Sequence, residues 1–367
     1  MDLIKRVKET IKKKELIKPQ DHILAGVSGG PDSIALVCIL QNIRHEFGFK
    51  LSVGHINHGL RKSSETDQVF VQKFCQRLGL DCFTSRLDIA SRKQEGSLEE
   101  IARDERFRSL CQLAKKIKAN TIALGHTQND LAETVLMRIL RGTGLLGLRG
   151  ISPKHDRKGI TIIRPLLETR RADIESFLRT RGILSRLDPT NRQTKFFRNK
   201  IRLRLLPLLK KQYNHNIEEV LTHLAHNSAA DYDFLAEQAK KHYRKMIPTP
   251  RYQTKRLLPL AGLLKIHASM RRMILRLAIE ELKNNGKPLS SRHIQEIESL
   301  MTIKPKGTVV DLPNDIKVTR EATCIRLTIA NKSIARDRKN AVCQDNTSHS
   351  NKKTTGKKCL NIKKNQL

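Results

Sequence analysis

The amino-acid sequence predicts an α/β protein. We expect a doubly wound parallel sheet, followed by a helical connector and a small α+β C-terminal domain. Between residues 23 and 124, short apolar runs alternate with amphipathic stretches, which is the pattern of parallel strands joined by helices. A glycine-rich turn follows the first apolar run, and the helical patterns after residue 250 give way to a predicted hairpin.

The glycine-rich turn, Ser28-Gly29-Gly30-Pro31-Asp32-Ser33, separates a predicted strand over 23–27 from a predicted helix over 33–47. Glycine lets the backbone approach a ligand closely, and the following helix offers free N–H groups to an anion. Ser28 and Ser33 can add hydroxyl donors, and Asp32 can hold Mg²⁺ on the same phosphates. The turn is neither a Walker A loop nor a Gly-x-Gly-x-x-Gly fingerprint. It predicts a phosphate site, with an ordinary strand-to-helix turn as the alternative.

The remaining elements of the first domain follow in order. Strands are predicted over 51–56, 82–87, 121–125 and 160–163, and helices over 64–79, 97–118, 129–141, 170–181 and 196–209. The helix over 170–181 should end at Gly182, and the one over 196–209 should bend or stop near Pro207. Ligands of open parallel sheets bind beyond the carboxyl ends of the strands. The segments 28–33, 55–61 and 125–130 should therefore converge.

The second half of the chain is predicted to be mostly helical. We expect helices over 216–245, 255–283 and 290–301, a hairpin of 309–312 with 316–320, and a third strand over 325–329. The resulting division is a catalytic domain over 1–215, a linker over 216–249, a C-terminal domain over 250–330 and a tail over 331–367. The tail has ten Lys and Arg against two Asp and few large apolar residues, so it should not fold by itself.

The composition favours a nucleic-acid partner. Lys and Arg total 71 against 36 acidic residues, a net charge of +35, which suits nucleic acid or, less often, an anionic membrane surface. No apolar stretch approaches the roughly 20 residues of a membrane span. With 10 Phe, 4 Tyr and no Trp, contacts to RNA should rest mainly on phosphates. The 7 cysteines form no Cys-x-x-Cys pair, which argues against a zinc ribbon or cysteine-held cluster and fits a reducing cytoplasm.

Several residues beyond the turn could carry chemistry. Asp130 and Glu133 lie one helical turn apart, where they could hold a cation and accept a proton, or merely complement the helix dipole. His55 and His126 follow predicted strands, and a structural role is their alternative. Arg103 and Arg106, three residues apart on one predicted helix, either contact a phosphate or form part of a solvated helix face.

Five stretches taken together resemble the tRNA(Ile)-lysidine synthase family of PP-loop ATPases: 28–33, 55–61, 125–134, 141–150 and 188–209. Residues 250–330 resemble that family's first C-terminal domain, and the second such domain of longer members has no counterpart. The resemblance implies an ATP-dependent ligase. It would adenylate C2 of the wobble cytidine in tRNA(Ile) with a CAU anticodon, and the ε-amine of L-lysine would then displace AMP. The resulting lysidine converts AUG decoding to AUA.

The resemblance also implies roles for particular residues. These are ATP and pyrophosphate binding by Ser28, Gly29, Gly30, Pro31, Asp32 and Ser33; adenosine binding by His55 and Asn57; catalysis or lysine binding by His126, Asp130, Glu133, Arg103 and Arg106; tRNA binding by Arg141, Arg149, Arg198 and Arg202; and Mg²⁺ binding by Asp32 and Asp130. The chain departs from the family at Asn129 and Leu131, where Asp and Gln are frequent.

Two other functions stay open at this point. A PP-loop tRNA cytidine thiolase would use the same adenylation, although the missing Cys-x-x-Cys speaks against it. A catalytically inactive tRNA-binding protein would keep the fold, but the intact turn, Asp130 and Glu133 argue for activity. The expected location is the cytoplasm, without a membrane partner, and a homodimer is an open alternative to a monomer.

Overall fold

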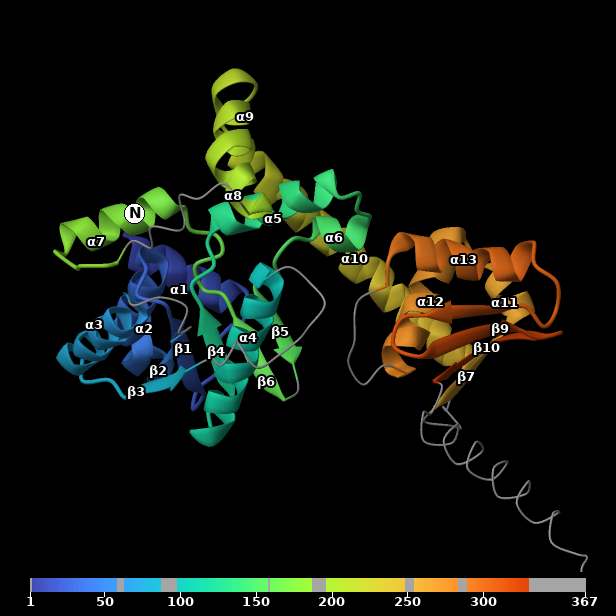
Figure 1. The fold of residues 1–367 in the computed structure, drawn as a ribbon, viewed down its shortest axis with the longest axis horizontal. Coiled ribbons are helices and arrows are strands. Elements are labelled where there is room, and N and C mark those ends of the chain that lie inside the picture. The colour runs from blue at the N-terminus through green and yellow to red at the C-terminus, as the bar shows by residue number, and fades with distance from the viewer. Residues whose placement is uncertain are drawn as a thin grey trace, which may run out of the picture. The chain divides into compact units, whose positions relative to one another are not determined.

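The computed structural model of the protein describes residues 2–57, 63–86, 98–157, 159–186, 196–247, 254–282 and 289–329. Its contacts divide the chain into two compact units, Met1–Asp233 and Phe234–Leu367. The division falls within the long helix α10 (Ile217–Met246), and the elements of both units are labelled in Figure 1. The domain limits given above remain a prediction.

The first unit contains a six-stranded sheet in the order β3-β2-β1-β4-β6-β5. Its strands are β1 (His22–Val27), β2 (Lys50–Asn57), β3 (Cys82–Arg86), β4 (Thr121–Leu124), β5 (Lys154–Arg157) and β6 (Ile160–Ile163). All neighbouring pairs are parallel except β5 with β6. The predicted parallel sheet is confirmed. Strand β5 was not predicted, because an antiparallel edge strand of sequence Lys-His-Asp-Arg carries no apolar pattern.

Helices cover both faces of this sheet. Those on the two faces are α1 (Leu3–Lys13), α2 (Pro31–Phe47), α3 (Ser63–Arg77), α4 (Leu98–Lys116) and α7 (Arg171–Thr180). Helix α5 (Gln128–Leu140) belongs to a separate core with η2 (Ile201–Leu205) and α10, and α6 (Leu145–Leu148) packs on α5. Successive side chains of β1 point to opposite faces. Ile23 belongs to the core shared with α1, α2, α3 and α7, whereas Leu24 belongs to the core shared with α4. The fold is therefore doubly wound, as predicted.

The segment after α7 departs from an ordinary helix. Residues 197–212 form α8 (Phe197–Lys200), a π-helical turn η2 (Ile201–Leu205) and α9 (Leu206–Gln212). The helix predicted to bend or stop near Pro207 does not stop there, because α9 continues to Gln212, but its regular geometry is interrupted by η2 just before the proline. Pro207 lies in the first turn of α9, where the wider π turn takes up the irregularity that proline imposes. The predicted helix end at Gly182, which has a φ of 61°, is confirmed.

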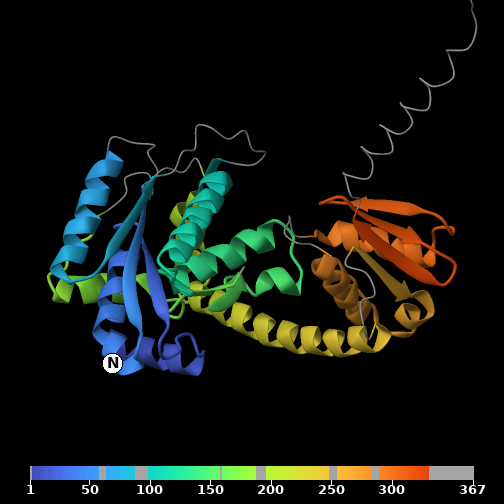
Figure 2. The same cartoon turned by 90° about the horizontal axis from the view of Figure 1, so that it is seen from below.

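The second unit is a small α+β structure. It comprises β7 (Lys255–Pro259), α11 (Leu260–Lys265), α12 (Ala268–Leu282), α13 (Ser291–Thr302), β8 (Val309–Leu312), β9 (Ile316–Arg320) and β10 (Cys324–Ile329). The strands are antiparallel in the order β7-β10-β9-β8, and α12 and α13 pack against them (Figure 2). The hairpin and third strand are confirmed. A helix over 255–283 is wrong at its start, because β7 buries alternate residues and pairs with β10.

Some expectations fall outside the described residues. They concern residues 58–61 of the segment after β2, residues 188–195 of the motif stretch 188–209, the limit between linker and C-terminal domain at 249–250, and the tail from 331. Within the part of the chain that the structure describes, no helix has the length and apolar character needed to cross a membrane.

Candidate active site

The glycine-rich turn is held in shape by its own serines. Gly29 has a φ of 89°, a conformation that side chains rarely allow. The Ser33 hydroxyl donates to the Gly30 carbonyl at 2.9 Å and accepts from the Ser28 N–H at 3.3 Å. From beyond α7, the N–H of Arg186 donates to the Gly29 carbonyl at 2.9 Å. The loop is thus fixed before any ligand binds.

Gly125, which follows β4, packs directly against this loop. A Cβ atom at Gly125 would lie 3.0 Å from the carbonyl oxygen of Asp32 and 3.2 Å from the nitrogen of Ser33. Because both atoms belong to the backbone, they could not move aside as a side-chain tip could. Sequence reasoning included Gly125 in a motif but assigned it no role; the glycine allows the ends of β1 and β4 to meet.

Asp32 pairs with an arginine that the sequence did not single out. Its Oδ2 accepts from the Arg171 guanidinium at 2.8 Å, while its Oδ1 is buried with no hydrogen-bond partner among the described residues. Burial raises the pKa of Asp32 although Arg171 opposes the shift. Burial lowers the pKa of Arg171, but Asp32, Asp130 and Glu133 outweigh it, so the net shift is upward. Arg171 therefore stays charged beside three carboxylates.

The predicted pair of carboxylates lies together at the start of α5. Asp130 closes a capping box, since its Oδ2 accepts from the Thr127 N–H at 2.9 Å. Its Oδ1 accepts from Arg198 of α8 at 2.9 Å. The same guanidinium donates to Oε2 of Glu133 at 2.7 Å, and Arg202 lies 3.7 Å from Oε1. Glu133 is only 1% exposed, so its carboxylate has little contact with water, and the arginines supply the hydrogen bonds and the charge compensation that water would otherwise provide.

The two carboxylates differ in how readily they bind a proton. Burial acts to raise the pKa of Asp130, but Arg198, His126 and Arg171 outweigh it, and the pKa is lowered. Burial raises the pKa of Glu133 more than Arg198 lowers it, and the nearby Asp130 charge adds to the rise. Asp130 is thus the better anion and Glu133 the better proton acceptor, a division useful in acid–base chemistry.

His126 is oriented by a buried arginine that sequence reasoning missed. Nε of Arg164 donates to Nδ1 of His126 at 3.2 Å, which places the proton of a neutral imidazole on Nε2. Arg164 also donates to the Ser152 carbonyl at 2.7 Å and contacts Nδ1 of His155 at 3.2 Å. Arg164 thereby links β6 to the segment that carries His126.

This arginine makes stability depend on pH through His155. Burial, followed by Arg164 and Arg157, lowers the pKa of His155 from 6.5 to about 4. Between these values the unfolded chain binds a proton that the folded protein does not, so acidification favours unfolding. We expect the urea midpoint to fall less between pH 7 and pH 4 in His155→Gln, whose amide oxygen can still accept from Arg164. Equal falls in wild type and variant would contradict this.

His55 stands at the end of β2 with one ring nitrogen free for a ligand. Nδ1 lies 2.9 Å from the Val27 carbonyl, and because a carbonyl only accepts, Nδ1 carries the proton. Nε2 is buried without a hydrogen-bond partner in the described part of the chain. Burial lowers the pKa of His55, although Val27 and Asp67 oppose the shift, so the imidazole stays neutral and Nε2 is an acceptor. Asn57 donates to Gln68 of α3 at 3.1 Å.

Of the predicted arginines, Arg198 and Arg202 are brought to the carboxylates, as described above. Arg106 is an exposed residue of α4, and the side chain of Arg103 lies outside what the structure describes. Arg141 stacks over Phe197, with 5.2 Å between the guanidinium carbon and the ring centroid. Arg149 pairs with Asp233 at 3.1 Å.

The donor set fits a magnesium ion held partly by substrate. Among the described residues, no group of three or more His, Cys, Asp or Glu could hold a metal. Mg²⁺, however, usually keeps several waters and binds through one or two carboxylates plus substrate phosphates. The buried, unpartnered Oδ1 of Asp32, at the start of the phosphate loop helix, suits that role.

Comparisons with known proteins agree with this geometry. Residues 1–209 match the family model described as PP-loop domain, and residues 258–324 match the TilS substrate binding domain. The tRNA(Ile)-lysidine synthase of Clostridioides difficile (strain 630) is 35% identical over 326 residues, covering 88% of this chain and 70% of that protein. The enzyme of the same name from Dehalococcoides mccartyi (strain CBDB1) is 35% identical over 319 residues, covering 85% and 67%.

One solved structure extends the comparison to the fold. The U34-tRNA thiolase NcsA from Methanococcus maripaludis, solved with its 4Fe–4S cluster, has a TM-score of 0.51 and is 19% identical. The match covers 61% of this chain and 78% of the thiolase. At this identity the likeness shows a shared fold and gives no support to thiolase chemistry. The predicted PP-loop type of sheet is confirmed.

Proposed function

Because this chain belongs to the tRNA(Ile)-lysidine synthase family, we propose that its phosphate loop and paired carboxylates join L-lysine to the wobble cytidine of tRNA(Ile). The chain is an ATP-dependent carbon–nitrogen ligase that acts on tRNA. One observation carries the assignment of the site. The preformed glycine-rich loop packs against Gly125 at the end of β4, and the chain leads from there to the carboxylates of Asp130 and Glu133. Arg171 pairs with Asp32 of the loop, and the charges of both carboxylates act on it.

The loop is suited to the first half of the reaction, in which ATP adenylates C2 of the cytidine. The N–H groups at the start of α2 and the hydroxyls of Ser28 and Ser33 can stabilise pyrophosphate as it leaves. Nε2 of His55, an acceptor in a buried position, matches the amino group of adenine. The Nε2–H of His126 can donate to charge developing on the α-phosphate.

Mg²⁺, when bound, would neutralise charge on the phosphates. Oδ1 of Asp32 is the protein ligand we assign to it, with Asp130 as the second candidate. Arg171, which pairs with Asp32, supplies a fixed positive charge beside the same groups. This arrangement is typical of a site that binds a phosphate–metal complex rather than a metal alone.

Asp130 and Glu133 are suited to the second half, in which the ε-amine of lysine attacks C2 and AMP leaves. The low pKa of Asp130 favours an anion that binds the lysine ammonium. The raised pKa of Glu133 favours a group that accepts the proton that the amine must lose before attack. In the described structure Arg198 binds both carboxylates, so a bound lysine would replace part of this ion pair.

The tRNA contacts are assigned to basic surfaces of both units. In the first unit these are Arg141, Arg149 and Arg202, and Arg103 and Arg106 keep the catalytic or lysine-binding role that the family implies. The second unit matches a substrate-binding domain and carries exposed or half-exposed arginines such as Arg272 and Arg292. Activity in the cytoplasm as a monomer or homodimer completes the proposal.

The test of the ATP-binding half is tRNA-dependent exchange between pyrophosphate and ATP. We expect exchange that requires CAU-anticodon tRNA(Ile) and Mg²⁺ and that EDTA abolishes. Asp32→Asn should raise the Mg²⁺ concentration needed for half-maximal exchange about tenfold or more, because it removes the charge from a metal ligand. Exchange without Mg²⁺, or an unchanged requirement in Asp32→Asn, would contradict the metal assignment. Exchange without tRNA would contradict the adenylated cytidine.

A further inference from the structure

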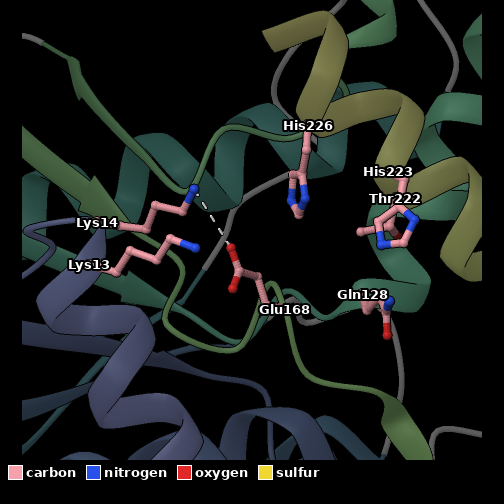
Figure 3. Close-up of a pocket in the computed structure, with 7 residues that line it drawn as sticks. All are labelled: Lys13, Lys14, Gln128, Glu168, Thr222, His223 and His226. Atoms are coloured by element: carbon pink, nitrogen blue, oxygen red, sulfur yellow. Dashed lines mark ion pairs between the residues drawn. The ribbon is translucent and has the colours of Figure 1, made fainter. Parts of the chain in front are cut away.

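A polar cavity lies within the first unit, apart from the residues assigned above (Figure 3). Its volume of about 430 Å³ falls in the usual range of ligand pockets, about 300–1,000 Å³. Its walls come from the end of α1, the start of α5, the segment before α7, and α10. The lining residues are Lys13, Lys14, Gln128, Glu168, Thr222, His223 and His226.

The walls carry an excess of positive charge. Figure 3 shows Lys13 and Lys14 extending from one side and His223 and His226 from the other, with Glu168 between them. Nζ of Lys14 lies 3.8 Å from the Glu168 carboxylate, so that pair is largely balanced. Lys13 and any protonated histidine are left without a balancing acid among the lining residues.

His226 adds no charge to the cavity while it is neutral. Burial is the main cause that lowers its pKa; Glu168 raises it, and Lys14, His223 and Lys13 lower it by smaller amounts. The excess of cationic donors on the walls therefore rests on Lys13 and Lys14 against the single carboxylate of Glu168. The side-chain amide of Gln128, two residues before Asp130 in α5, adds a neutral donor to the walls.

We propose that this cavity binds one backbone phosphate of the RNA substrate. A phosphodiester carries one negative charge and oxygen acceptors only, which match the cationic and amide donors on the walls. Gln128 and Asp130 both lie in the first turn of α5 but project from different sides of the helix. A strand with one nucleotide at the carboxylates would therefore pass the start of α5 to place a neighbouring phosphate in the cavity. The inference rests on tRNA being the substrate, and the cavity would fix the register of the strand.

The test is the salt dependence of tRNA binding. Lys13 and His223 are exposed residues outside the catalytic machinery, so Lys13→Gln/His223→Gln should fold. The slope of log K against log salt is negative, and losing one phosphate contact reduces its magnitude by about 1. Binding at low salt weakens several-fold. Lys5→Gln is the matched control, because Lys5 is an exposed lysine on the same helix and does not line the cavity. Its slope should stay close to that of wild type.

Three results would overturn the proposal. The first is a double variant with the wild-type slope, and the second is a change no larger than that of Lys5→Gln. The third concerns binding of inorganic phosphate to the protein. If the double variant loses this binding while its slope for tRNA stays that of wild type, the cavity binds a free anion and not the RNA backbone. Binding is measured without turnover, so the slope decides even if wild type fails to transfer lysine.

Discussion

Asp130→Asn should reduce transfer of lysine to tRNA by about 10² to 10⁴ while leaving the fold intact. Loss of a charge that positions the attacking amine costs about 10²-fold or more, because a misplacement of about 1 Å at the reacting atoms can cost that much. The amide oxygen of Asn can still accept from the Thr127 N–H, so the helix cap at 2.9 Å survives. What disappears is the negative charge that we assign to the lysine ammonium. The measurement is the initial rate of ATP-dependent lysine incorporation, with the melting temperature measured in parallel.

The pyrophosphate exchange of the same variant separates the two roles proposed for Asp130. If Asp130 acts on lysine, exchange persists when transfer is lost; if it holds Mg²⁺, both are lost. Asp81→Asn is the matched control, because Asp81 is exposed and lies outside the site. Transfer by Asp130→Asn within about threefold of wild type would contradict both roles.

Arg198→Ala should be the most destabilising of the single substitutions considered. It removes the guanidinium that lies 2.9 Å from Asp130 and 2.7 Å from Glu133, whose side chains are 15% and 2% exposed. Removing one partner of a buried ion pair costs about 3 to 5 kcal/mol, and we expect about 3 kcal/mol because Arg202 remains 3.7 Å from Glu133. The measurement is the free energy of unfolding in urea.

A double-mutant cycle tests whether the carboxylates cause that loss. Glu133→Gln removes the buried charge that Arg198→Ala leaves unpaired. The double variant should therefore lose about 2 kcal/mol less unfolding free energy than the two single variants lose together. Arg204→Ala, an exposed arginine of the adjacent π turn, should change stability by less than about 0.5 kcal/mol. Additive effects of the two substitutions would show that Arg198 stabilises the protein elsewhere.

Local features of the site could be predicted from the sequence. The turn at 28–33 can be recognised in the sequence because the apolar run, the two glycines and the helical pattern are contiguous. In the structure they form β1, the loop and α2. Asp130 and Glu133 share a face because residues three apart on a helix do so. His55 could be placed at a strand end because β2 is a buried apolar run.

What closes the site could not be predicted, because its contacts are long-range. Arg171 and Asp32 are separated by 139 positions, and Arg198 and Asp130 by 68, so no local pattern joins them. The sequence suggested tRNA as the partner of Arg198, whereas the structure places its guanidinium on the two carboxylates. Strand β7 was missed for a related reason. Its five residues merge into a longer helical pattern, and only pairing with β10 makes them a strand.

The most direct test of the central claim is incorporation of radiolabelled L-lysine into unmodified CAU-anticodon tRNA(Ile). The purified protein is incubated with ATP and Mg²⁺, and the same tRNA with the wobble cytidine replaced serves as control. Label that depends on ATP, appears only in the tRNA with the cytidine and is lost in Asp130→Ala is the predicted result. Consumption of ATP on tRNA without incorporation of lysine would contradict the account, because another nucleophile would then complete the reaction.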